Sequence, residues 1–138
     1  PIKYISPKYI FMSSSAPKKI FVVDDDPMLT MALEDYLTRK VPHQVTVFDT
    51  GEACLQNLAD KPDVIVLDYY LNSVHKDAAN GMEILQTIKK QLPNAHVIML
   101  SSQERYGIAM QTLIKGAEQY VIKDESAFEK VAEMIEGF

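Results

Sequence analysis

Acidic, hydroxyl and ammonium side chains follow four short apolar runs of this sequence. Three consecutive acids, 24–26, follow the first of these runs, and Asp68 follows another. A pair of serines, 101–102, and then Lys123 follow two later runs. Carboxylate oxygens suit a hard cation, and a lysine beside them suits an anion. If the fold gathers them, these residues could bind a metal ion and a phosphoryl group together.

Phosphoryl transfer onto a carboxylate is the chemistry that this set of residues predicts. Carboxylates brought close together repel one another, so a divalent cation is needed to hold them in one site. Mg²⁺ prefers oxygen ligands and binds one or two carboxylates together with a phosphate. A carboxylate can attack a phosphoryl group and form an acyl phosphate, while Lys123 and Ser101 stabilise negative charge on its oxygens. We therefore expect Asp68 to accept a phosphoryl group with Mg²⁺ bound beside it.

Alternating strands and helices are expected to position these residues. The apolar runs are rich in β-branched residues, which predicts strands buried on both faces. Five strands are expected, at 20–23, 45–48, 64–67, 97–100 and 120–122. Apolar residues at helical spacing follow each strand, with Pro27 opening the first helix and Gly116 closing the fourth. This alternation predicts an α/β fold, a doubly wound, five-stranded parallel sheet with helices on both faces.

The carboxyl ends of the strands are where a ligand is expected, because doubly wound sheets bind ligands there. The acids, serines and lysine named above all fall at such ends. The second strand offers only Asp49, which is better explained as a helix cap. Asp49 or Thr50 can cap the next helix, with Glu52 in capping-box position relative to Asp49. No glycine-rich phosphate loop follows the first strand, so a nucleotide or flavin site is not expected there.

Length and composition limit the classes of protein to consider. A chain of 138 residues, 47% of them hydrophobic, suits one globular domain. The formal net charge of −5 disfavours direct binding to nucleic acid, which requires clustered Lys and Arg. No apolar run approaches the length of a membrane helix, and the single cysteine, Cys54, excludes an internal disulfide. These features predict a cytoplasmic protein in which Cys54 is an inert core residue.

The N-terminal segment, residues 1–16, lacks a steady periodicity. Met12, followed by three serines, has the character of a natural start. We therefore interpret residues 1–16 as a remnant of an expression vector, ending at Phe11, plus a flexible N-terminus. A native extension that packs on the domain is the alternative. Residues 17–138 are expected to form the folded domain.

Four motifs, in this order, resemble those of the receiver domain of two-component response regulators. They are VVDDDP at 22–27, VIVLD ending at Asp68, VIMLSS ending at Ser102 and YVIKD at 120–124. The resemblance covers about residues 18–138 and implies a flavodoxin-like sheet with strand order 2-1-3-4-5. It implies a signalling protein rather than an enzyme, whose only chemistry is its own phosphorylation and dephosphorylation. The implied phosphoryl donor is a sensor histidine kinase or a histidine phosphotransfer protein.

The resemblance assigns a role to each residue that matches a family motif. Asp68 is implied to be the phosphoacceptor, and Lys123 to pair with the phosphorylated side chain. Ser101 is implied to turn toward the phosphate, and Tyr120 to rotate inward with it as an aromatic switch. Four Mg²⁺ ligands are implied: the side chains of Asp24, Asp25 and Asp68 and the backbone carbonyl of Tyr70. The implied output surface is the face formed by the fourth helix, the fifth strand and the fifth helix.

Three departures from the family pattern carry further expectations. The loop 69–80 is long for the family, lacks the usual proline after Asp68, and is interpreted as a solvent-exposed excursion or as a partner contact. Asp124 stands where a cis-proline commonly follows the lysine, so a trans peptide bond is expected there. Tyr70 and Gln103 occupy two positions that influence how water reaches the acyl phosphate. The bulky Tyr70 is expected to slow its hydrolysis.

Two other functions fit some of the same residues. A phosphatase of the haloacid dehalogenase type would use Asp24 as its nucleophile, with Asp26 as the acid two residues later, but this chain is short for that class. A receiver without phosphoryl chemistry would act as an interaction scaffold. The expected partners are the kinase or phosphotransfer protein and an unidentified downstream protein, with no nucleic acid and no membrane. A homodimer that forms on phosphorylation is also compatible with the resemblance.

Overall fold

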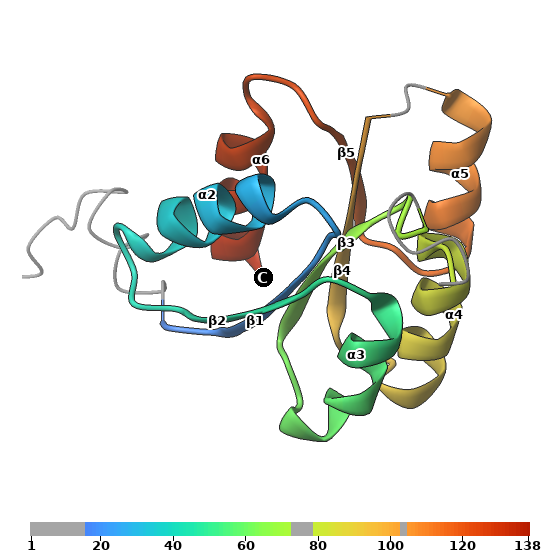
Figure 1. The fold of residues 1–138 in the computed structure, drawn as a ribbon, viewed down its shortest axis with the longest axis horizontal. Coiled ribbons are helices and arrows are strands. Elements are labelled where there is room, and N and C mark those ends of the chain that lie inside the picture. The colour runs from blue at the N-terminus through green and yellow to red at the C-terminus, as the bar shows by residue number, and fades with distance from the viewer. Residues whose placement is uncertain (1–15, 73–78, 103–104) are drawn as a thin grey trace, which may run out of the picture.

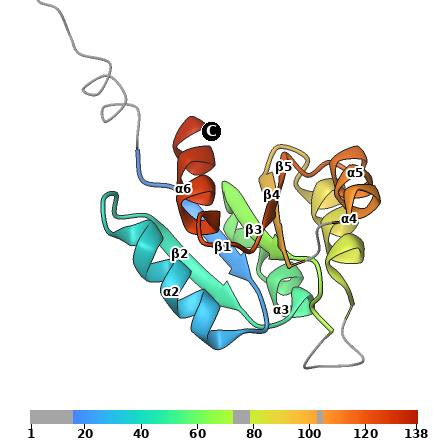
Figure 2. The ribbon, with the colours of Figure 1, turned by 90° about the horizontal axis from the view of Figure 1, so that it is seen from above.

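The computed structural model describes residues 16–72, 79–102 and 105–138. These residues contain a five-stranded parallel sheet with the order β2-β1-β3-β4-β5, which is seen from above in Figure 2. The strands are β1 (Lys19–Val23), β2 (Gln44–Phe48), β3 (Val64–Asp68), β4 (His96–Ser101) and β5 (Gln119–Ile122). The predicted fold class and strand order are confirmed.

Helices cover both faces of the sheet, with α2 and α6 on one face and α3, α4 and α5 on the other (Figure 1). The helices are α2 (Pro27–Thr38), α3 (Gly51–Gln56), α4 (Gly81–Gln91), α5 (Tyr106–Ile114) and α6 (Ala127–Gly137), with a short 3-10 helix, η1 (Leu58–Asp60), after α3. The first four of these α-helices each lie between two parallel strands, as crossover connections in such a sheet must, whereas α6 follows the last strand, β5.

Two hydrophobic cores, one on each face of the sheet, explain why the strands are apolar without alternation. In β3, Val64 and Val66 pack against α2 and α6, whereas Ile65 and Leu67 pack against α3 and α4. Successive side chains of a strand point to opposite faces, so a strand covered on both sides is apolar throughout. The polar side chain of Asp68 therefore comes only at the last residue of β3.

Side chains cap the N-termini of α2, α3 and α4. Asp26 caps α2 by accepting two backbone N–H groups of its first turn. Thr50, one of the two predicted caps, caps α3 by accepting the N–H of Ala53, so the alternative of Asp49 as the cap with Glu52 in its capping box is wrong. The Glu52 carboxylate instead accepts the backbone N–H of Ala79, 27 residues further along the chain, at 2.9 Å.

Some predictions fall on residues outside the described ranges. These residues include 1–15 of the N-terminal segment, 73–78 of the long loop, and Gln103. Within the described ranges, Gly116 has a φ of 111° just after α5, which agrees with the predicted helix end. No helix in the described parts of the chain has the length and apolar character needed to cross a membrane.

Candidate functional site

A cleft of about 470 Å³ opens at the carboxyl ends of the central strands. Its lining residues come from segments that follow strands, where a doubly wound sheet is expected to bind ligands. They are Asp24, Asp25, Asp26, Asp68, Tyr70, Ser102 and Lys123. The structure therefore brings together the acids and the lysine that the sequence distributes over three separate strand ends.

The carboxylates of Asp24, Asp25 and Asp68 form a compact cluster in this cleft. Each offers a ligand oxygen, and these oxygens lie within 4.8 Å of one another. Asp24 and Asp68 are buried, at 3% and 4% exposure, whereas Asp25 is half-buried. Asp24 Oδ1 accepts the backbone N–H of Asp26 at 2.9 Å, while the Asp26 side chain turns away to cap α2. Of the three consecutive acids, Asp24 and Asp25 therefore belong to the cluster and Asp26 does not.

Lys123 bridges the two buried carboxylates. Its Nζ atom lies 2.9 Å from Asp24 Oδ2 and 3.2 Å from Asp68 Oδ1. Burial alone would lower the pKa of Lys123, but the charges of Asp68 and Asp24 outweigh burial and raise this pKa. Lys123 is therefore held in its charged form at the mouth of the acid cluster.

One ammonium does not neutralise the crowded carboxylates. Burial, and then the charge of Asp24, raise the pKa of Asp68 to about 6. Burial also raises the pKa of Asp24, despite its contact with Lys123. Asp24 Oδ2 is fully buried, and apart from the Lys123 ion pair no described group completes a well-aligned hydrogen bond to it. An excess of buried, under-coordinated carboxylate oxygen fits a divalent cation such as Mg²⁺.

The segment after Lys123 is built without a proline. The described residues contain no cis peptide bond, which agrees with the trans peptide expected before Asp124. The N–H of Asp124 donates to the carbonyl of Ile122 at 2.8 Å, a bond that a proline could not make. Asp124 Oδ1 in turn accepts from the backbone N–H and the hydroxyl of Ser126, each at 3.0 Å, just before α6. Hydrogen bonds therefore hold the turn that follows Lys123.

Ser101 and Tyr120 lie beside each other on neighbouring strands. Ser101 ends β4 and is fully buried, and its hydroxyl shares a hydrogen bond with that of Tyr120 in β5. Burial raises the pKa of Tyr120, and the Ser101 hydrogen bond only partly offsets this effect. Ser102, rather than Ser101, lines the cleft. The sequence did not single out Ser102, although its place directly after the strand was a signal that it reaches the strand end.

Tyr70 lies over the cleft next to the acceptor candidate. Its backbone N–H donates to Asp68 Oδ1 at 3.3 Å, and its side chain helps to line the cleft. The rings of Tyr69 and Tyr70 meet edge to face, with centroids 4.8 Å apart. Tyr69 also packs on the core under α3 and α4. The expected position of Tyr70 near Asp68 is therefore found.

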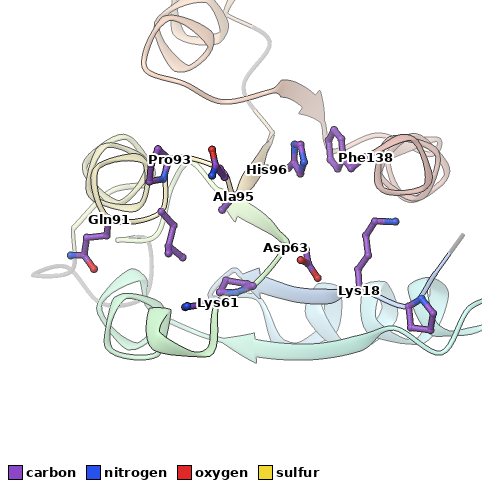
Figure 3. A pocket seen from close by; sticks show the side chains of 12 residues that line it. Lys18, Lys61, Asp63, Gln91, Pro93, Ala95, His96 and Phe138 are labelled. Atoms are coloured by element: carbon purple, nitrogen blue, oxygen red, sulfur yellow. The ribbon is translucent and has the colours of Figure 1, made fainter. Parts of the chain in front are cut away.

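A second pocket, of about 550 Å³, lies at the opposite edge of the sheet (Figure 3). It opens near the amino ends of β1 and β4, where the rings of His96 and Phe138 stack at a centroid distance of 4.1 Å. Lys18, Lys61 and Asp63 also line it. A strand's length separates this pocket from the acid cluster, so it takes no part in the chemistry of that cluster.

Comparison with known families agrees with the fold. The model of the response regulator receiver domain matches residues 20–136, so this chain belongs to that family. The four motifs that suggested the resemblance all lie inside the matched region.

Individual relatives are similar over most of this chain. The response regulator protein VraR of Staphylococcus saprophyticus is 30% identical over 121 residues, which are 86% of this chain and 55% of VraR. The chemotaxis protein CheY of Thermotoga maritima is 23% identical over 107 residues, 77% of this chain and 85% of CheY. The BeF3-activated receiver domain of DrrB, a Thermotoga maritima protein, is 28% identical with a TM-score of 0.73, covering 88% of this chain and 96% of that domain.

The chain spans about half the length of VraR. VraR and CheY carry the names of signalling proteins, and the similarity to VraR lies in the part that corresponds to the receiver domain.

Proposed function

We propose that this chain accepts a phosphoryl group on Asp68 from a sensor histidine kinase or a histidine phosphotransfer protein. The observation that carries the proposal is the position of Lys123 Nζ, 2.9 Å from Asp24 Oδ2 and 3.2 Å from Asp68 Oδ1. Lys123 at this position could pair with a phosphoryl group on Asp68 once a divalent cation shares the carboxylate charge. Membership of the receiver family supports the same assignment.

The proposed transfer exchanges a P–N bond for a P–O bond. A carboxylate oxygen of Asp68 attacks the phosphorus, and the bond to the donor imidazole breaks. The imidazole keeps the electron pair of that bond and leaves neutral when its second nitrogen carries a proton. Lys123, already beside Asp68, then pairs with the negative charge on the transferred group, because its flexible stem lets the ammonium follow that charge.

The acid cluster is the proposed site for Mg²⁺. Asp24, Asp25 and Asp68 would supply side-chain oxygens, and Tyr70 would supply its backbone carbonyl. When bound, Mg²⁺ would neutralise the phosphoryl oxygens and so reduce their repulsion by the acceptor. Lys123 alone leaves the pKa values of Asp24 and Asp68 raised, which supports a requirement for a further cation.

The proposed response to phosphorylation is a change at α5, β5 and α6. Because Ser101 and Tyr120 share a hydrogen bond, a movement of Ser101 toward a phosphate would disturb Tyr120 in β5. The neighbouring α5 holds apolar side chains in solvent: Tyr106 is 78% and Ile114 67% exposed, while Thr112 is the one buried residue of this helix. An apolar helix that remains exposed is typical of a protein-binding surface. That surface would serve a downstream protein or a second copy of this chain.

Phosphorylation with a small acyl phosphate tests the acceptor directly. The protein is incubated with acetyl phosphate and Mg²⁺, and its intact mass and the modified peptide are determined. We expect one added phosphoryl group on the peptide that contains Asp68, and none in the Asp68→Asn variant. Modification at Asp24 would indicate the phosphatase-type chemistry instead. Failure to modify the folded protein at all would leave only the scaffold function.

A further inference from the structure

Glu52 makes a contact that the sequence does not predict. This residue lies in the first turn of α3, where Thr50 already caps the helix through the N–H of Ala53. The Glu52 side chain is therefore not needed as a cap, and its Oε2 atom accepts the N–H of Ala79 at 2.9 Å. Ala79 belongs to the returning end of the loop 69–80, the segment that leaves Asp68. A carboxylate on one helix thus holds the backbone of the long loop.

The helix that carries Glu52, α3, packs closely against α4, the helix that begins two residues after Ala79. Gly51, the first residue of α3, packs so closely on Ile84 of α4 that a Cβ atom at Gly51 would overlap the Ile84 side chain. Asn80 caps α4 by accepting the N–H of Glu83 at 3.1 Å. Ala79 itself packs on the core beneath α3 and α4. Glu52 therefore projects from a rigid support rather than from a loose surface.

The backbone from Ala79 leads directly to the acceptor segment. Two residues after Ala79, the N–H of Gly81 donates to the carbonyl of Tyr69 at 2.8 Å. Gly81 lies so close that a Cβ atom there would stand 2.7 Å from Tyr69 Cα and overlap the carbonyl oxygen of Asp68. Any shift of residues 79–81 is therefore passed to residues 68 and 69. Tyr70, whose carbonyl is the proposed backbone ligand, follows immediately.

We propose that Glu52 is a positioning residue for the metal centre: by holding Ala79 it fixes the return of the loop 69–80, and so the place of the Tyr70 carbonyl. This inference rests on the proposed function, because it assumes that the cleft binds Mg²⁺. The bond has a charged acceptor, which makes it stronger than a neutral hydrogen bond. Its loss would remove the side-chain bond from α3 to the described end of this loop, while the cap of α4 and the hydrogen bond of Gly81 would remain.

Titration of the whole chain with Mg²⁺ by calorimetry tests this role. In Glu52→Ala we expect the dissociation constant for Mg²⁺ to rise about tenfold, the lower end of the effect seen for groups that orient metal ligands. Glu52→Gln keeps a side-chain oxygen that can accept the N–H of Ala79, so it should restore binding. The matched control is Glu83→Ala, which removes an exposed carboxylate from the first turn of α4. This control should bind Mg²⁺ as the unmodified chain does.

The outcomes separate this inference from the function on which it rests. If the unmodified chain binds Mg²⁺ and Glu52→Ala binds it equally well, the positioning role is overturned while the proposed function stands. Equal weakening in Glu52→Gln or in Glu83→Ala also overturns it, because charge alone would then explain the effect. If the unmodified chain binds no Mg²⁺, the proposed function fails, and the inference with it. Faster amide hydrogen exchange at Ala79 in Glu52→Ala, with an unchanged melting temperature, would locate the effect in the loop.

Discussion

At the scale of single residues, Asp68 lies in a site that disfavours the ionised form of its carboxyl group. Its pKa is raised from an ordinary value of 3.8 to about 6, first by burial and then by Asp24, against the opposing effect of Lys123. Ionisation of Asp68 therefore lowers the free energy of unfolding as the pH rises from 3.8 to about 6. Above about pH 6 this loss of stability is complete. Two pKa units correspond to about 3 kcal/mol. A bound cation would offset that cost, so the same carboxylates that oppose folding by their crowding would favour cation binding.

Tyr70 is the residue whose replacement should change the lifetime of the phosphorylated form. Its side chain lines the cleft and is braced edge to face by Tyr69. A ring over the acyl phosphate excludes water from it. We expect Tyr70→Asn to lose its phosphoryl group several-fold faster than the unmodified chain, measured by following the phosphorylated mass after removal of the donor. Tyr106→Asn, at a 78% exposed position on α5, is the control and should decay at the ordinary rate. If Tyr70→Asn lost its phosphoryl group at the same rate as the unmodified chain, Tyr70 would not protect the acyl phosphate from water.

At the scale of elements, the site depends on how tightly α4 begins against the end of β3. Gly81 opens α4 with its backbone against Asp68 and Tyr69, and its N–H donates to Tyr69 O. Because the obstructing atoms are backbone atoms, they cannot turn aside as a flexible side chain can. Asn80, the cap of α4, directs the helix from this contact. The start of one helix thus sets the geometry of the segment that follows Asp68.

Gly81→Ala should therefore damage both the stability and the site. Overlap of the new methyl group with this backbone should cost about 1–3 kcal/mol or more in the free energy of unfolding, measured by urea denaturation. Gly107→Ala is the matched control, since a Cβ atom at Gly107 in α5 meets nothing within 4 Å. Because alanine has the better helix propensity, Gly107→Ala should increase the free energy of unfolding by at most about 1 kcal/mol. A neutral effect of Gly81→Ala would show that α4 can move without loss.

His43 gives the start of the sheet a dependence on pH. Its Nδ1 atom accepts the N–H of Lys18 at 3.0 Å, which joins the segments leading into β1 and β2. Burial, and then the charge of Lys18, lower the pKa of His43 from 6.5, so the unfolded chain binds this proton more readily. The contribution of His43 to stability should be fully present above pH 6.5 and should decrease as the pH drops below this value. It should be absent once the pH lies below the folded-state pKa of His43.

The variant His43→Asn isolates this contribution. Asparagine offers a neutral oxygen that can accept the same N–H but does not titrate. We expect the difference in free energy of unfolding between His43→Asn and the unmodified chain to grow in favour of the variant from about pH 8 to about pH 5, the range in which histidine titrates. A difference that stays constant over this range would contradict the assignment to His43.

At the scale of the whole molecule, two cores enclose the sheet and leave chemistry only at its edge. Cys54, on α3, is fully buried in the core shared by α3 and α4. Burial raises the pKa of its thiol to about 12, so almost no reactive thiolate exists in the folded protein. The predicted core position of Cys54 is confirmed, and its inertness stays a prediction. Reaction at Cys54 therefore requires the core to open.

Cys54 can then report how Mg²⁺ stabilises the folded chain. A cation that binds only the folded protein, at ten times its dissociation constant, adds about 1.4 kcal/mol of stability. When opening and closing are fast relative to labelling, the rate follows the open population, so Mg²⁺ should slow thiol labelling about tenfold. Asp25→Asn removes one proposed ligand and should abolish most of this slowing. Equal protection in Asp25→Asn would place the stabilising cation elsewhere.

Much of the fold and of the site could be predicted because both depend on local patterns. The unbroken apolar run before Asp68 required a strand covered on both faces, and that strand ended at Asp68, one residue beyond the run. The contact of Glu52 with Ala79 could not be predicted in this way. Glu52 stood in a capping-box pattern with Asp49, and nothing local distinguishes that pattern from a carboxylate that reaches a distant loop.

The sequence by itself determined the order of strands and helices, the family, and which acids, serine and lysine stand at strand ends. Periodicity and strand-end position are properties of neighbouring residues, and a parallel sheet necessarily brings its carboxyl ends to one edge. Only the tertiary structure decided that Lys123 bridges Asp24 and Asp68, that Ser102 rather than Ser101 lines the cleft, and that Gly81 abuts the acceptor segment. These features depend on distances between residues far apart in the chain, which packing fixes and local pattern does not.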